Sequence, residues 1–209
     1  MRKVPIINLG KRVLIISEGY EEADYLNRLK ECGIWNQSVR IDIKNAKSID
    51  EIAARYEYDY QSGIYALIVV FCDTEKPPYQ QFKSLKMELD KFHGNHASEA
   101  IVYFANPCTL QVVLSHFSDV KLKTNSKAGN ADLIEKLTGV PDYKATERQR
   151  TSIMRKITAD NYIEMKKNIS KLSRDYTIVP SSNCLPLFDG LDGKTSAWIK
   201  GCNEEIEKE

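Results

Sequence analysis

Two acidic residues follow the most apolar stretch of the chain. Asp73 and Glu75 come just after residues 67–72, Leu-Ile-Val-Val-Phe-Cys, a run typical of a strand buried on both faces of a parallel sheet. Side chains two residues apart point the same way in an extended segment, so both carboxylates should face one site. Carboxylates this close repel one another unless a cation or proton lies between them, and carboxylate oxygens suit Mg²⁺. The spacing predicts a site for Mg²⁺ (or Mn²⁺) where this strand ends.

A second acidic motif follows another buried-strand pattern. Residues 12–17 read Arg-Val-Leu-Ile-Ile-Ser, and Glu18 and Gly19 come next. If both strands are parallel and adjacent, Glu18 lies at the same sheet edge as Asp73 and serves as a further ligand. Glu22 falls in the first turn of the following helix, where an acid also stabilises the helix dipole without any other function. Both interpretations of Glu22 stay open.

Strand and helix patterns alternate along the first half of the chain. The patterns predict an α/β fold with a four-stranded parallel sheet flanked by helices over residues 10–118, after a lead-in over residues 1–11. A mostly helical extension with a C-terminal tail is expected over residues 119–209. The strands are predicted at 12–17, 39–44, 65–71 and 100–104, with a further strand at 176–179, and the helices at 21–31, after Ser48, at 81–92, from Pro107 and at 160–172.

The order of these motifs resembles the Toprim domain shared by topoisomerases, primases and OLD-type nucleases. Residues 18–22, Glu-Gly-Tyr-Glu-Glu, resemble the Glu-Gly-x-Thr-Glu form of the OLD branch. Residues 104–108, Phe-Ala-Asn-Pro-Cys, and 114–117, Leu-Ser-His-Phe, resemble a signature of RloB-like proteins. Two residues depart from the pattern: Glu75 replaces the usual second Asp, and Leu110 replaces a Glu expected after Asn-Pro-Cys.

The resemblance implies a metal-dependent nuclease that acts on RNA, including tRNA, or on DNA, as the effector of an anti-phage defence module. It implies Glu18, Glu22, Asp73 and Glu75 as metal ligands, with Glu18, Asp73 and Glu75 taking part in catalysis. Lys144, in a Tyr-x-Lys element, would neutralise the scissile phosphate. RloB-like proteins are typically encoded beside an ABC/AAA-type ATPase, which is the expected partner. The alternative is a catalytically weakened Toprim protein that serves as a regulatory or binding subunit of that ATPase.

Four residues near these motifs have simpler interpretations. Asn106 sits between a strand and a helix, where capping would account for it, although it would also lie near the metal edge. Cys108 is more typical of a small buried residue than of a nucleophile. His116 is expected as a satisfied or exposed residue at a helix end, and a solvated surface lysine is the alternative at Lys144.

Composition limits the other function classes. Lys and Arg number 30 and Asp and Glu 29, so nucleic acid must be bound by a local basic patch. Five cysteines without a Cys-x-x-Cys pair argue against a zinc site and a disulfide framework. No signal peptide or membrane-length apolar run is evident, which predicts a cytoplasmic protein without membrane contact. Self-association is left open.

Overall fold

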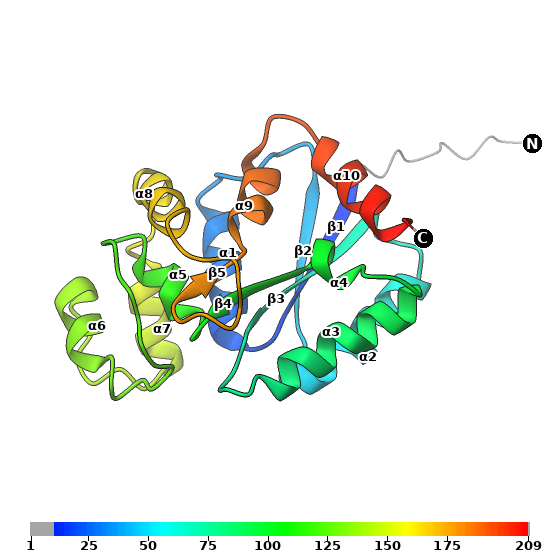
Figure 1. Ribbon diagram of the computed structural model, residues 1–209. Helices are drawn as coiled ribbons and strands as arrows, with labels where there is room; N and C mark the ends of the chain where they lie inside the picture. Colours follow the sequence, from blue (N-terminus) through cyan, green and yellow to red (C-terminus); the bar gives the residue numbers. More distant parts are fainter. Residues whose placement is uncertain (1–10, 209) are drawn as a thin grey trace, which may run out of the picture.

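The computed structural model describes residues 11–208, so the predicted lead-in lies, apart from Lys11, outside the described residues. A five-stranded sheet in the order β2-β1-β3-β4-β5 forms the centre of the fold (Figure 1). The strands are β1 Arg12–Ser17, β2 Arg40–Asn45, β3 Leu67–Asp73, β4 Val102–Asn106 and β5 Ser181–Ser182. The helices are α1 Tyr20–Glu31, the 3₁₀ turn η1 Ile49–Glu51, α2 Ile52–Gln61, α3 Gln80–His93, α4 Ser98–Ile101, α5 Leu110–Leu114, α6 Ala131–Thr138, α7 Glu147–Met154, α8 Ala159–Ile169, α9 Leu185–Asp192 and α10 Ala197–Ile206.

The two apolar runs form the middle of the sheet. Strands β1 and β3 pair with each other in parallel, and five of six residues in β1 and six of seven in β3 are buried. A strand covered by helices on both faces has no solvent side, which is why these runs do not alternate. The predicted α/β class, with a mostly parallel sheet flanked by helices, is confirmed.

Helices cover both faces of this sheet. Helix α1 packs against β1 and β2, whereas α2 packs against β1 and β3. Figure 1 shows α2 and α3 together on one side of the sheet and α1 on the other. With the faces of the sheet covered, the loops that follow β1 and β3 lie at the carboxyl ends of these strands, where open α/β sheets form their sites.

The sheet has one strand more than predicted. Strand β5 pairs with β4 in the antiparallel direction through Ala105 and Asn106, and the expected strand at 176–179 is absent from the structure. β5 consists of two polar serines, which show no alternation of apolar and polar residues, so the sequence pattern does not indicate this strand. The expectation of four strands, all parallel, was therefore wrong at this edge.

Three local predictions also differ from the structure. Ser48 precedes a 3₁₀ turn and makes no side-chain capping hydrogen bond. Pro107 does not open a helix, because α5 begins only at Leu110. No helix was predicted in the stretch 180–197, but it contains α9, whose buried face of Leu187, Phe188 and Leu191 joins the core.

The C-terminal part returns to the sheet. After the helical extension, residues 119–175, the chain adds β5 to β4 and packs α10 against β3 and α4. One hydrophobic core cluster includes residues from both sides of the predicted boundary at residue 118. Within residues 11–208, no helix is both long and apolar enough to cross a membrane.

Candidate active site

The strand order reverses between β1 and β3. The chain runs from β1 outward to β2 and then returns to β3 on the other side of β1. In open α/β sheets, ligands bind outside the carboxyl ends of the strands at such a reversal, because the following loops diverge there. Glu18 follows β1 and Asp73 ends β3. Both acidic motifs thus lie at this switch point.

Hydrogen bonds fix the carboxylates of Glu18 and Asp73. The backbone N–H of Asp73 donates to Oε2 of Glu18 at 3.0 Å. Thr109 donates to Oδ1 of Asp73 from its backbone N–H at 2.6 Å and from its hydroxyl at 2.8 Å. No donor among residues 11–208 contacts the second oxygen of either carboxylate through a hydrogen bond. Each carboxylate is therefore oriented through one oxygen and keeps the other for a ligand.

Glu22 and Glu75 line the same cavity as Glu18 and Asp73. Glu22 is buried, and its Oε2 accepts a hydrogen bond from the backbone N–H of Gly19 at 3.0 Å. Glu75 lies beyond the end of β3 with a φ of 62°, so the period-two argument for its direction does not apply. Left-handed backbone of this kind is costly for a residue other than glycine and is often found at functional sites.

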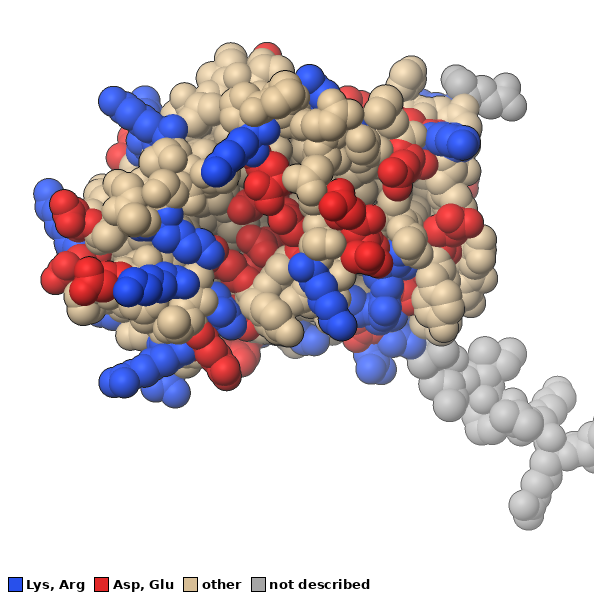
Figure 2. All heavy atoms as spheres, turned by 90° about the horizontal axis from the view of Figure 1, so that it is seen from below, with Lys and Arg blue, Asp and Glu red and all other residues tan. Residues whose placement is uncertain are grey.

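We call this hollow the acid cavity, and its volume is about 360 Å³. Figure 2 views the molecule from below and shows acidic side chains around a hollow in the middle of this face, with lysines and arginines beside it toward the helical extension. The acid cavity is lined by Glu18, Gly19, Tyr20, Glu21, Glu22, Asp73, Glu75, Cys108, Asn125, Lys127, Ala145 and Arg150.

Burial and mutual repulsion raise the pKa values of these acids. The pKa of Glu18 rises to about 8, first because burial disfavours its charged form and then because of the charge on Glu22. Burial also raises the pKa of Asp73 well above its usual range, with the charges of Glu22 and Glu18 adding to the effect. The pKa of Glu22 is raised by burial and by Glu21. Without a cation, the acid cavity thus favours protonated carboxyl groups.

The helical extension forms one wall of the acid cavity. Tyr143 donates a short hydrogen bond to Oε1 of Glu21, and Nζ of Lys127 lies 3.6 Å from the other oxygen of Glu21. The Nε of Arg150, on α7, lies 2.7 Å from Oδ2 of Asp24. These contacts fasten the extension to the start of α1. They also place two cations beside the carboxylates.

The other residues singled out from the sequence lie in different surroundings. Lys144 is exposed and lines a neighbouring cavity with Arg148 and Gln149, not the acid cavity. Asn106 is buried, and its side chain donates to the carbonyls of Tyr176 and Ile178 at 2.7 and 3.0 Å. It therefore fastens the returning chain to the sheet, and it neither caps α5 nor lines the acid cavity.

Cys108 lines the acid cavity but is buried. Burial, followed by the nearby charge of Asp73, raises the pKa of its thiol well above the usual value. The thiol thus stays protonated, which argues against a nucleophile and agrees with the interpretation as a small buried residue.

His116 joins the sheet domain to the helical extension. It lies just beyond α5, is buried, and has Tyr25 Oη 2.9 Å from its Nε2 and Asn161 Oδ1 3.0 Å from its Nδ1. The amide nitrogen of Asn161 donates to the carbonyl of Lys156, so the amide oxygen accepts a hydrogen bond from Nδ1–H of His116 and the tyrosine hydroxyl donates to Nε2. This pattern requires the neutral imidazole, and burial lowers its pKa to about 4.

We expect His116 to destabilise the fold in acid. Because its folded pKa of about 4 lies below the unfolded value of about 6.5, the unfolded chain binds the proton first and stability falls between pH 6.5 and 4. The loss should reach about 3 kcal/mol. Urea unfolding at pH 7 and pH 4 should show a smaller pH-dependent loss for His116→Gln than for the wild type, with the exposed His96→Gln as control. Equal losses in wild type and His116→Gln would contradict this assignment.

The donor chemistry of the acid cavity fits Mg²⁺, but the arrangement is incomplete. Within residues 11–208, no three His, Cys, Asp or Glu side chains are arranged so that they could hold a metal ion. Mg²⁺ usually keeps several waters and binds through one or two carboxylates together with substrate phosphates. The free oxygens of Glu18 and Asp73 are suitable for that mode. The predicted four-ligand set with Glu22 and Glu75 stays a prediction.

Sequence reasoning missed three residues of this site. Thr109 directly follows the Asn-Pro-Cys element. Its position just after the carboxyl end of β4 could have indicated that it belongs to the site. Lys127 and Arg150 lie in stretches without strand or motif patterns, and their approach to α1 depends on tertiary packing alone. No sequence signal distinguishes them from the other basic residues of the helical extension.

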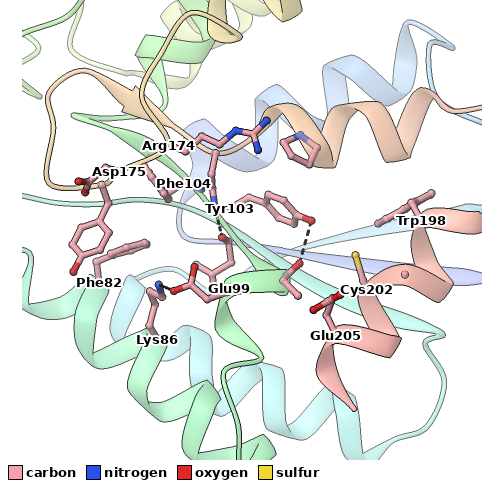
Figure 3. A pocket seen from close by; sticks show the side chains of 16 residues that line it. Phe82, Lys86, Glu99, Tyr103, Phe104, Arg174, Asp175, Trp198, Cys202 and Glu205 are labelled. Atoms are coloured by element: carbon pink, nitrogen blue, oxygen red, sulfur yellow. Dashed lines mark hydrogen bonds and ion pairs between the residues drawn. The ribbon is translucent and has the colours of Figure 1, made fainter. Parts of the chain in front are cut away.

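A larger cavity, of about 700 Å³, lies elsewhere, beside β4, α3 and α10 (Figure 3). Its rings include Tyr103 and Trp198, and Lys86 in its wall is paired with Glu99 at 2.5 Å. The side chain of Asn183 hydrogen-bonds to the backbone of β4 there: it accepts from the N–H of Phe104 and donates to the carbonyl of Val102. Its lining includes Glu99, Asp175 and Glu205, but Glu99 is paired with Lys86 and Asp175 accepts two hydrogen bonds from Thr177. The acid cavity is therefore the better candidate active site.

No family model, curated protein or solved structure matches the chain. Its function is therefore inferred from the site and from the resemblance of its motifs.

Proposed function

We propose that this protein is a metal-dependent phosphodiesterase that cleaves nucleic acid. The observation that carries the proposal is the placement of Glu18, Glu22, Asp73 and Glu75 around one cavity at the β1/β3 switch point. Buried or half-buried carboxylates that repel one another cost stability, and a divalent cation removes that cost. Hydrolysis of a phosphodiester also requires the neutralisation of negative charge, which such a cation provides.

The residues of the acid cavity have separate roles in this proposal. Asp73, held by Thr109, is the fixed carboxylate ligand. Glu18, with a pKa of about 8 in the absence of a cation, acts as a second ligand or exchanges a proton with the reacting water or leaving group. When bound, Mg²⁺ would lower the pKa of a water molecule and stabilise the charge on the phosphate. Glu22 and Glu75 are the further candidate ligands.

The cations around the acid cavity would contact the phosphate backbone. Lys127 and Arg150 lie in its wall. On and beside α7, Lys144, Arg148 and Arg155 line neighbouring cavities, and none has an acidic group within 4.0 Å among the described residues. We assign Lys144 to binding of the flanking backbone, since it lies outside the acid cavity. Such contacts are independent of sequence and weaken with salt.

The resemblance to RloB-like proteins extends the proposal to a biological setting. It favours an effector of an anti-phage defence module whose activity is restrained by an ABC/AAA-type ATPase. Expression with and without an ATPase encoded beside the gene, followed by sequencing of cellular RNA and DNA ends, tests this setting. The setting would be supported by new RNA or DNA ends that are absent with Asp73→Ala and fewer in number when the ATPase is present.

A catalytically weakened subunit is the second candidate function, and two observations favour it. Leu110 is fully buried in the core, so the position where a Glu is expected cannot supply a carboxylate. The acid cavity also lacks a group of three ligands in position to bind an ion. In this case the protein would bind nucleic acid or the ATPase without cleaving.

Incubation of the purified protein with RNA and DNA oligonucleotides separates the two candidates. The phosphodiesterase should cleave in Mg²⁺ or Mn²⁺ and should be inert with a chelator. A weakened subunit should leave every substrate intact under both conditions.

A further inference from the structure

Tyr20 is a large aromatic residue left exposed at the acid cavity. It is the first residue of α1, lines the cavity with the carboxylates, and is 64% exposed. Tyr25, on the same helix, is fully buried in the core. The exposed part of the ring contributes no packing energy to the fold and is open to a ligand beside the carboxylates.

Arg150 supports one side of the Tyr20 ring. Its guanidinium lies 5.6 Å from the ring centroid, and it is held by Asp24 at 2.7 Å and by the carbonyl of Ala145 at 2.6 Å. The arginine side chain is only 13% exposed. A fixed cation therefore covers part of the ring, while most of the ring surface remains open to a ligand.

A second exposed tyrosine shows that this pairing alone does not mark a site. Tyr58 is 70% exposed and has the guanidinium of Arg55 6.0 Å from its ring centroid. Tyr58 lies on α2 and does not line the acid cavity. The distinguishing property of Tyr20 is thus its place beside the carboxylates, where the substrate phosphate would bind.

We propose that Tyr20 stacks on an unpaired base next to the scissile phosphate, so that the substrate is single-stranded nucleic acid. This inference rests on the proposed phosphodiesterase function. Proteins that bind single strands combine cationic grooves with exposed aromatic rings, because an unstacked base offers its face to the ring. In a duplex both faces of each base are covered by its neighbours. The acid cavity, at about 360 Å³, is near the lower end of the range for small-ligand pockets.

A double-mutant cycle tests this contact: the Tyr20 ring and the base are removed separately and then together. Cleavage is measured in Mg²⁺ for wild type and Tyr20→Ala, on a single-stranded oligonucleotide and on matched oligonucleotides with an abasic site placed at each position near the cleavage point. Tyr20→Ala should lower kcat/KM by about tenfold or more on the intact strand. On the strand with the critical abasic site, Tyr20→Ala and wild type should be equal. Tyr20→Trp should retain activity, and Tyr58→Ala should match wild type.

The failures of the two proposals are distinguishable. If wild type cleaves single strands and duplexes equally well and Tyr20→Ala changes neither, the stacking proposal is overturned while the phosphodiesterase function stands. An equal loss for Tyr20→Ala on intact and abasic strands would also overturn it, because the residue would then act on the fold or the carboxylates. If wild type cleaves no strand in Mg²⁺ or Mn²⁺, the phosphodiesterase function fails and the stacking proposal fails with it.

Discussion

Replacement of Asp73 by alanine is expected to lower nucleic-acid cleavage by about a thousandfold or more. Asp73 is half-buried at the end of β3, and two hydrogen bonds from Thr109 hold its carboxylate. The variant loses a proposed ligand charge, and no other carboxylate is held in that place. Single-turnover cleavage of a labelled oligonucleotide in saturating Mg²⁺ measures the effect. Glu75→Asp should be much milder, because it keeps a carboxylate and moves the oxygens by one methylene.

The control for this series is Glu88→Gln, an exposed acid on α3 away from the acid cavity. It should cleave like wild type, and a thermal melt should show that each variant is folded. If wild type and Asp73→Ala are equally inert, also in the presence of an ATPase encoded beside the gene, the weakened-subunit proposal replaces the nuclease proposal. Wild-type activity in Asp73→Ala would rule out the acid cavity as the active site.

Glu18→Gln is expected to stabilise the protein at high pH in the absence of metal. The folded pKa of Glu18, about 8, lies above its ordinary value of 4.5, so folding favours its protonated form. Stability is therefore lost as the pH rises from 4.5 to 8, and above pH 8 the full cost of the charge remains. The glutamine stays neutral and can still accept from Asp73 N–H. At pH 9 the gain should be as much as about 5 kcal/mol, which guanidinium unfolding with a chelator would detect.

The same variant links stability to function. At pH 4, where Glu18 is protonated in both states, the two proteins should be equally stable within about 1 kcal/mol. Adding Mg²⁺ with a single-stranded oligonucleotide at pH 8 should stabilise wild type more than Glu18→Gln, because only the wild type gains a carboxylate ligand. A variant less stable than wild type at pH 9 would show that the carboxylate cluster does not strain the fold.

The centre of the fold and the position of the site follow from local sequence patterns. The apolar runs of β1 and β3 are long enough to identify buried strands. Because sites in open α/β sheets lie at the carboxyl ends of the strands, Glu18 and Asp73 are then expected at the same site, without knowledge of the rest of the fold. This prediction was possible because a long apolar run and the acids that follow it can be recognised in the sequence itself.

The parts that were not predicted depend on contacts distant in sequence. Arg150 approaches Asp24 only after the helical extension has packed on α1. His116 was expected at a helix end, but its burial follows from Tyr25 and Asn161, 91 and 45 residues away. β5 has two residues and exists because it pairs with β4. None of these features leaves a periodic pattern in the chain.

Calorimetric titration of Mg²⁺ into the protein tests the central claim most directly, with an oligonucleotide made non-cleavable by a methylene in place of the bridging oxygen, so that both non-bridging phosphate oxygens remain for Mg²⁺. Because Mg²⁺ is commonly shared between carboxylates and substrate phosphates, wild type should bind the ion weakly alone and at least about tenfold more tightly with the oligonucleotide. Asp73→Ala should show no such tightening, whereas Glu88→Gln should behave like wild type. The same Mg²⁺ affinity in wild type and Asp73→Ala, with and without the oligonucleotide, would contradict a metal-dependent site in the acid cavity.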